Sequence, residues 1–326
     1  MAFPTQRPRR LRRTAALRRL VAETTLRRDD LVAPLFVREG IDEPQPVPSL
    51  RGVAQHTVAS LRREVRRLAD LGVPAVILFG VPARKDAEGS EAWNPDGIVQ
   101  VALRALRDEV GDDVVLMADL CVDEYTDHGH CGIVAADGSV DNDATLAIYQ
   151  QAAVAQAAAG AHVCAPSGMM DGQVAAIRSA LDGAGHREVA ILAYAAKYAS
   201  ALYGPFRDAV DVTIRSGDRK GYQQDWRNSR EALTEVQADI AEGADMVMVK
   251  PAVTYLDVIA RTREAVNVPL GAYHVSGEYA MIDAAHQRGW IDGPAVALEQ
   301  LTAVKRAGAD FVLTYFAGEM AEALGG

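Results

Sequence analysis

The chain has 326 residues, a length typical of one large α/β domain, and 49% of its residues are hydrophobic, which argues against disorder. No apolar run reaches the roughly 18 residues of a membrane helix and no signal-peptide pattern opens the chain, so we expect a cytoplasmic protein with no membrane partner. Three cysteines, Cys121, Cys131 and Cys164, are too few for a disulfide framework and indicate a metal site or free thiols.

The net charge of −10 is unevenly distributed along the chain. Residues 1–30 contain nine arginines against Glu23, Asp29 and Asp30, a balance of +6, so the remainder carries −16. Such a basic arm could bind nucleic acid or a neighbouring copy of the same acidic protein. No aromatic residues interleave the arginines, which favours oligomerisation over nucleic-acid binding. We therefore expect an N-terminal arm, residues 1–30, that builds a homo-oligomer and binds no nucleic acid.

Apolar runs and helical patterns alternate after the arm. The predicted strands are residues 31–37, 75–79, 114–119, 162–166, 190–197, 245–250, 270–275 and 310–315. The predicted helices are residues 61–71, 98–110, 144–160, 173–181, 229–242, 256–266, 278–288 and 295–307. Eight strand–helix units without an internal linker predict one (β/α)8 TIM barrel, an α/β fold, over residues 31–326. An open, doubly wound sheet is the alternative, although the sequence contains no dinucleotide or phosphate-loop motif.

Two of the predicted strands end in a lysine, Lys197 and Lys250. A single lysine in this position often only marks where a strand leaves the core. In a barrel, however, the C-terminal strand ends are where catalytic groups gather. An unprotonated lysine there can form a Schiff base with a carbonyl substrate, and two neighbouring ammonium groups lower each other's pKa. We therefore predict that both lysines are catalytic.

Further polar residues are expected at the same end of the barrel. Residues 198–228 are long and lack hydrophobic periodicity, so we predict that this lid segment covers the active site. It contains Arg207 and Arg219, which are either solvated surface charges or ligands for a carboxylate. Ser276 and Tyr315 add hydroxyl groups after two later strands. The pattern indicates a substrate that carries both a carbonyl and a carboxylate group.

A second cluster of reactive side chains lies in residues 119–132, here called the cysteine loop. It contains thiol, imidazole and carboxylate groups, which are the ligand types for zinc, directly after a predicted strand. The spacing is not that of a zinc finger, so a polar loop with incidental cysteines is the alternative. Cys164 lies in a short apolar strand and is interpreted as a core residue.

Several longer motifs resemble those of the porphobilinogen synthase family, also called 5-aminolevulinate dehydratase. The similar stretches occur in order from about residue 7 to the C-terminus. They are residues 166–172, 196–209, 217–223, 248–251, 255–257 and 274–281.

The resemblance implies a hydro-lyase of tetrapyrrole (heme) biosynthesis that needs no organic cofactor. Two molecules of 5-aminolevulinate would condense to porphobilinogen with loss of two waters. Lys250 would hold the molecule that gives the propionate side, and Lys197 the one that gives the acetate side. The implied substrate contacts are Arg207 with Arg219 for one carboxylate, Ser276 with Tyr315 for the other, and Gln223 and Asp119 as secondary contacts.

The resemblance also implies metals and an assembly. The zinc-dependent pattern of the family has three cysteines, whereas this chain has Cys121, Asp123 and Cys131, so we expect zinc to bind more weakly here. Glu235 matches the family's allosteric magnesium carboxylate, and Arg13 lies in the arm region associated with it. A homo-octamer is implied, with the arm around a neighbour and a hexamer as a possible second assembly.

Two other functions are consistent with parts of the sequence. Another Schiff-base barrel lyase, similar to a class I aldolase, would explain one lysine but neither the paired lysine nor the cysteine loop. A nucleic-acid binder would explain the arm but not the barrel.

Overall fold

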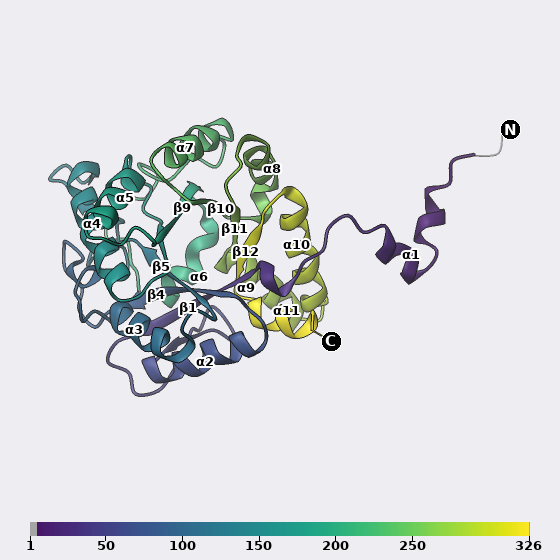
Figure 1. Ribbon diagram of the computed structural model, residues 1–326, viewed down its shortest axis with the longest axis horizontal. Helices are drawn as coiled ribbons and strands as arrows, with labels where there is room; N and C mark the ends of the chain where they lie inside the picture. The colour runs from purple at the N-terminus through teal and green to yellow at the C-terminus, as the bar shows by residue number, and fades with distance from the viewer. Residues whose placement is uncertain (1–4, 326) are drawn as a thin grey trace.

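Parallel strands form a closed barrel at the centre of the molecule, and helices surround it (Figure 1). The structure is a computed structural model that describes residues 5–325. The ring closes because β1 pairs with β12, so the (β/α)8 barrel is confirmed and the open-sheet alternative is wrong. In order around the ring the strands are β1 (Leu31–Arg38), β4 (Ala75–Val81), β5 (Val115–Leu120), β8 (Val163–Pro166), β9 (Ala190–Lys197), β10 (Met246–Lys250), β11 (Leu270–His274) and β12 (Phe311–Thr314).

The longer helices lie outside the barrel (Figure 1). Their buried residues are mostly apolar and belong to the hydrophobic core. These helices are α2 (Val58–Asp70), α3 (Ile98–Val110), α4 (Asn142–Ala158), α5 (Gln173–Gly183), α7 (Arg230–Ala241), α8 (Leu256–Ala265), α9 (Ser276–Gln287), α10 (Gly293–Ala307) and α11 (Ala317–Ala323). Helix α2 begins three residues before its predicted start because the Thr57 hydroxyl accepts the backbone N–H of Ser60 at 3.0 Å and caps the helix. Within residues 5–325, no helix is long and apolar enough to cross a membrane.

The sequence does not predict several short elements. They are β2 (Gln45–Pro46), β3 (Ala54–His56), β6 (Ile133–Val134), β7 (Val140–Asp141), and the 3-10 turns η3 (Ser90–Ala92) and η5 (Val253–Tyr255). Strands of two or three residues are too short to produce a recognisable alternation. Strand β3 has a structural role, since Gln55 pairs opposite Phe36 on β1 beyond the point where β1 leaves β12.

The lid segment folds back on the end of β9. It contains two short helices, η4 (Ala201–Tyr203) and α6 (Gly204–Ala209). Ala199 N–H donates to the Gln224 carbonyl at 2.9 Å, and Gln224 N–H donates to the Lys197 carbonyl at 3.0 Å. These bonds hold both ends of the segment beside Lys197.

The described part of the arm lies away from the barrel (Figure 1). It contains η1 (Pro8–Arg12), α1 (Ala15–Leu20) and η2 (Arg28–Asp30). The arm contacts the barrel at the arm's own C-terminal end. There the Asp30 carboxylate pairs with Lys305 at 3.1 Å, and Arg28 Nε donates to the Ala321 carbonyl at 2.8 Å. Leu20 is 79% exposed, so the chain's own barrel leaves this apolar side chain uncovered.

Candidate active site

Lys197 and Lys250 end two neighbouring strands and lie directly opposite each other. Their Cα atoms are register partners between β9 and β10, and the two side chains are buried. Between the paired positions Ala193 and Ala196, β9 has one residue more than β10, which is a β-bulge. A bulge changes the directions in which the neighbouring side chains point. Tyr194 therefore lies near both amino groups, with 5.7 Å from its ring centroid to Lys197 Nζ and 5.1 Å to Lys250 Nζ.

Lys250 lies in a cage of aromatic rings. Besides Tyr194, the ring centroids of Tyr273, Tyr203 and Phe206 lie 4.5, 5.2 and 5.2 Å from its Nζ atom. Burial lowers the pKa of Lys250 to about 7, and the positive charge of Lys197 acts in the same direction. A substantial fraction of Lys250 is therefore a neutral, nucleophilic amine at neutral pH.

Lys197 has a polar environment. Its Nζ atom donates to the Ser167 carbonyl at 2.5 Å. Burial alone would lower the pKa of Lys197, but Cys131, Cys121 and the nearby carboxylates raise it above the ordinary value. Two lysines that look alike in sequence thus differ in protonation at neutral pH.

Asp119, at the end of β5, is a buried carboxylate that is suited to act as an acid–base group. Ser167 Oγ donates to its Oδ2 atom at 3.0 Å, while Oδ1 has no hydrogen-bond partner among the described residues. Burial raises the pKa of Asp119 to about 6, against the opposing charges of Lys197 and Lys250. A carboxyl group that titrates near neutral pH can both take up and release a proton.

The cysteine loop brings three potential metal ligands together. Ligand atoms of Cys121, Asp123 and Cys131 all lie within 4.8 Å of one another, and the three residues are buried. Burial raises the pKa of Cys121, whereas for Cys131 a hydrogen bond from Cys121 and the charge of Arg219 outweigh burial and lower it. Two sulfur atoms and a carboxylate fit a soft divalent ion such as zinc. Among the described residues this is the one such group.

The two predicted arginines and Gln223 line one cavity of about 750 Å³, together with residues of the lid segment. Arg219 Nη2 contacts the Asp123 carboxylate and the Gly129 carbonyl, each at 2.8 Å. Three buried donor atoms have no partner within residues 5–325: Nε of Arg207, Nε of Arg219 and Nε2 of Gln223. Unpartnered buried donors are costly, so this cavity is suited to an anionic ligand that would accept from them.

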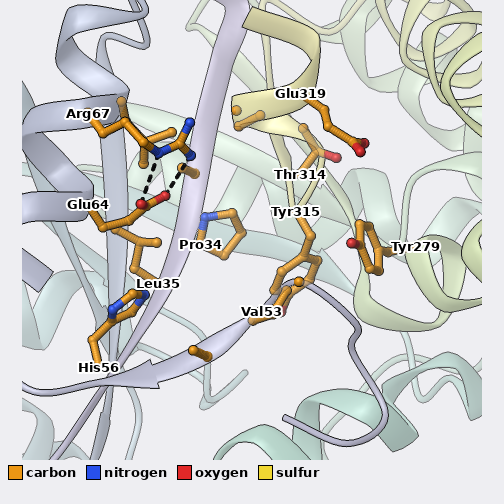
Figure 2. Close-up of a pocket in the computed structure, with 16 residues that line it drawn as sticks. Pro34, Leu35, Val53, His56, Glu64, Arg67, Tyr279, Thr314, Tyr315 and Glu319 are labelled. Atoms are coloured by element: carbon orange, nitrogen blue, oxygen red, sulfur yellow. Dashed lines mark hydrogen bonds and ion pairs between the residues drawn. The ribbon is translucent and has the colours of Figure 1, made fainter. Parts of the chain in front are cut away.

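Ser276 and Tyr315 each form a hydrogen bond with a residue of the Lys250 cage. Ser276 Oγ accepts the Phe206 N–H at 3.0 Å, and the Tyr315 hydroxyl lies 3.2 Å from that of Tyr273. Tyr315 also lines a second cavity, of about 300 Å³, where β1 and β12 separate; Figure 2 shows it beside Pro34 and Tyr279.

Glu235 lies apart from the residues around the lysines. It is on α7 and lines a polar cavity of about 490 Å³ that also contains Asp171 and Glu231. Burial and the charges of these carboxylates raise the pKa of Glu235. Arg13 is exposed, and the arm that contains it extends away from the barrel of its own chain (Figure 1).

Sequence reasoning missed the aromatic cage and Ser167. Tyr203 and Phe206 are aromatic residues in a lid segment with many polar residues, and that contrast was the available signal. Tyr194 is three residues from Lys197, a spacing that regular strand alternation assigns to opposite faces. Only the bulge in β9 brings both into one volume.

Comparison with known proteins identifies close relatives over the whole chain. Residues 5–323 match the protein family described as delta-aminolevulinic acid dehydratase. A delta-aminolevulinic acid dehydratase of Mycobacterium tuberculosis is 58% identical over 322 residues, covering 98% of each chain, and one of Streptomyces coelicolor is 56% identical over 325 residues, covering 99% of this chain and 98% of that one.

A solved structure is similarly close. The delta-aminolevulinic acid dehydratase (porphobilinogen synthase) of Toxoplasma gondii ME49, in complex with the reaction product porphobilinogen, superimposes with a TM-score of 0.95 at 44% identity. The match covers 98% of this chain and 91% of that one.

Proposed function

The chain belongs to the delta-aminolevulinic acid dehydratase family, and from this premise we propose how its own residues carry out the family's reaction. The activity is that of porphobilinogen synthase, a lyase that joins two molecules of 5-aminolevulinate and releases two waters. The proposal concerns the roles of the residues, the metals and the assembly.

The observation that carries the proposal is the paired placement of Lys197 and Lys250, buried and in register on adjacent strands. Each amine attacks the ketone carbon of one substrate, and a water leaves as the carbon–nitrogen double bond forms. Lys250 reacts as the neutral amine that its aromatic cage favours, and it holds the propionate-side molecule. Lys197 holds the acetate-side molecule and must first lose a proton.

Asp119 is suited to accept that proton. Its pKa of about 6 lies near neutrality, and its charge acts on both lysines. The same carboxyl group can return protons when the hydroxyl groups depart as water and remove them when the ring is formed. Ser167, which contacts both Asp119 and Lys197, holds the two groups close together for this proton transfer.

The substrate carboxylates are held at two places. Arg207, Arg219 and Gln223 offer three buried, unpartnered donors for one carboxylate. Ser276 and Tyr315 offer hydroxyl groups for the other, and each contacts a wall of the Lys250 pocket. The lid segment, residues 198–228, excludes water while both substrates are bound.

Cys121, Asp123 and Cys131 would hold zinc, with the fourth position left for water or substrate. Bound zinc would act as a Lewis acid near the amine of the second substrate. One carboxylate in place of a third thiolate is expected to weaken zinc binding. Glu235 would bind an allosteric magnesium ion, beside Arg13 from the arm of another subunit.

The assembly is proposed to be a homo-octamer in which each arm packs on a neighbouring barrel, with a hexamer as a second form. The exposed Leu20 and the opposite charges of arm and body support this. A cytoplasmic location and the lack of nucleic-acid partners stay predictions.

The test combines product formation with trapping. Purified enzyme incubated with 5-aminolevulinate should form porphobilinogen, measured colorimetrically, and borohydride should fix substrate on peptides containing Lys250 and Lys197. A sugar phosphate that labels the enzyme where 5-aminolevulinate does not would instead favour an aldolase-like lyase. Repeating the assay in a strong chelator tests the zinc proposal separately.

A further inference from the structure

Helix α6 carries two side chains that belong to the active site. The Phe206 ring is part of the Lys250 cage and packs against Phe79, with 5.0 Å between ring centroids. Arg207 lines the cavity proposed for the substrate carboxylate. A helix of six residues is too short to be stable alone. The positions of Phe206 and Arg207 therefore depend on what holds the ends of α6.

Side chains from distant parts of the chain hold α6 at both ends. At its N-terminal end, Phe206 N–H donates to Ser276 Oγ. At its C-terminal end, Gln55 Nε2 donates to the Ala209 carbonyl at 2.7 Å. Carbonyl groups in the last turn of a helix lack intrahelical partners, so such donors fix both the place and the direction of the helix.

Lys85 makes the most extensive of these contacts. Its Nζ atom donates to two successive carbonyls after α6, Val210 at 3.1 Å and Asp211 at 2.9 Å. Asp211 has φ of +51°, one of two positive values among the described non-glycine residues, and its carboxylate pairs with Arg38. An unfavourable backbone conformation of this kind persists where the surroundings hold it. Lys85 and Arg38 supply that support.

The backbone around Lys85 is itself held firmly. The Asp86 carboxylate accepts the N–H groups of Gly89 at 2.7 Å and Ser90 at 3.0 Å, which closes a tight turn. Asp127 N–H donates to the Asp86 carbonyl at 2.9 Å, which ties this turn to the cysteine loop. Lys85 thus reaches α6 from a rigid part of the barrel.

The electrostatic environment of Lys85 includes Asp211. Burial lowers the pKa of Lys85, and the charge of the Asp211 carboxylate opposes this and favours the ammonium form. The ammonium form has three N–H donors, and its charge makes the hydrogen bonds to both carbonyls stronger than those of a neutral amine.

We propose that Lys85 is a positioning residue of the reaction, which fixes the C-terminal end of α6 and thereby sets Arg207 and Phe206 against the substrates. Lys85 is not among the residues that line the substrate cavity, so it acts through α6. The kinetic consequences of this inference rest on the proposed function, whereas the role of Lys85 in holding the C-terminal end of α6 does not.

The kinetic test compares Lys85→Met with Lys85→Arg and with Arg84→Met, a matched control in which the neighbouring, exposed cation is removed. Lys85→Met should lower kcat/KM for 5-aminolevulinate by about ten- to a hundredfold, as expected for a misplaced binding group. Most of the loss should be in KM, because a carboxylate contact made in both ground and transition states is weakened. Lys85→Arg should keep most of the wild-type kcat/KM, and Arg84→Met should have the same kcat/KM as the wild type.

Two further measurements separate positioning from a general structural effect. In the double variant with Arg207→Met, Lys85→Met should lower kcat/KM by a smaller factor than it does alone, because both substitutions weaken the same contact with the substrate. Trypsin should cleave after Arg215, in the lid segment, faster in Lys85→Met than in the wild type or Arg84→Met. If Lys85→Met fails to fold, Lys85→Gln, which keeps one donor group, should give an intermediate loss.

Unchanged KM and tryptic cleavage in Lys85→Met would overturn the proposal, as would a loss confined to kcat or fully additive with Arg207→Met. If the wild-type enzyme forms no porphobilinogen, the proposed function fails instead. The trypsin experiment still decides whether Lys85 holds the C-terminal end of α6 in place.

Discussion

Asp123 and Arg219 form an ion pair inside the protein, with 2.8 Å between Oδ2 and Nη2 and both side chains almost fully buried. Asp123 belongs to the cysteine loop and Arg219 to the lid segment. Burial alone would raise the pKa of Asp123, but the charges of Arg219 and Lys197 lower it below the ordinary value. The pair therefore joins the proposed metal site to the proposed carboxylate site through two charges that depend on each other.

Removing one partner of this pair should destabilise the protein strongly. Arg219→Met leaves the Asp123 carboxylate buried without its main counter-charge, which we expect to lower the free energy of unfolding by about 3–5 kcal/mol. The double variant Asp123→Asn/Arg219→Met removes both charges and should recover part of that loss. Denaturant titration of the three proteins measures this, and equal stability of single and double variants would contradict it.

Both lysines are expected to be indispensable for turnover. Lys250→Ala and Lys197→Ala should each lose nearly all porphobilinogen formation while remaining folded, because each removes one of the two imine-forming amines. Borohydride should still trap substrate on Lys197 in Lys250→Ala and on Lys250 in Lys197→Ala. Near-normal activity in either variant would exclude the two-imine mechanism for this chain.

The pH dependence of catalysis should report the pKa of Lys250. Because the neutral amine is the reactive form, kcat/KM should fall as the pH decreases below about 7, approaching tenfold per pH unit. Tyr273→Ala opens the aromatic cage to water, which should raise the pKa of Lys250 and move the profile to higher pH. Tyr273→Phe keeps the ring and serves as the control, and a profile that does not move in Tyr273→Ala would show that burial by this ring is unimportant.

The cysteine loop should bind zinc with an affinity that its third ligand limits. Asp123→Cys should retain more zinc than the wild type during dialysis, and Cys131→Ala should retain none and lose activity. Since thiolates must be deprotonated to bind, retention should decrease as the pH falls. Elemental analysis and turnover on the same samples provide the measurement, and a zinc-free wild type that is fully active in chelator would identify the site as metal-free.

The arm should determine the size of the assembly. Deleting residues 1–28 removes its nine arginines together with the exposed Leu20, so sedimentation should show smaller species than the full-length protein. Circular dichroism should show an intact barrel, because the deletion removes the Arg28 hydrogen bond to Ala321 but keeps the ion pair of Asp30 with Lys305. An unchanged octamer-sized peak would rule out this role.

The barrel was largely predictable because its strands are buried on both faces. Continuous apolar runs such as residues 246–249 identify such strands without tertiary information, and the lysines that end two of them are visible in the same pattern. The length and number of strand–helix units then favoured closure. Short elements such as β3 and α6 escaped prediction because too few residues carry their pattern.

The sequence by itself thus determined the barrel, and it placed two lysines at strand ends and two cysteines in the loop after another strand. Only the tertiary structure decided that the two lysines are chemically different. Aromatic rings from three separate segments exclude water from Lys250 and lower its pKa, whereas negative charge on Cys131 and on the nearby carboxylates raises the pKa of Lys197. Desolvation and charge act through space, so a pKa depends on which distant segments the fold brings into contact.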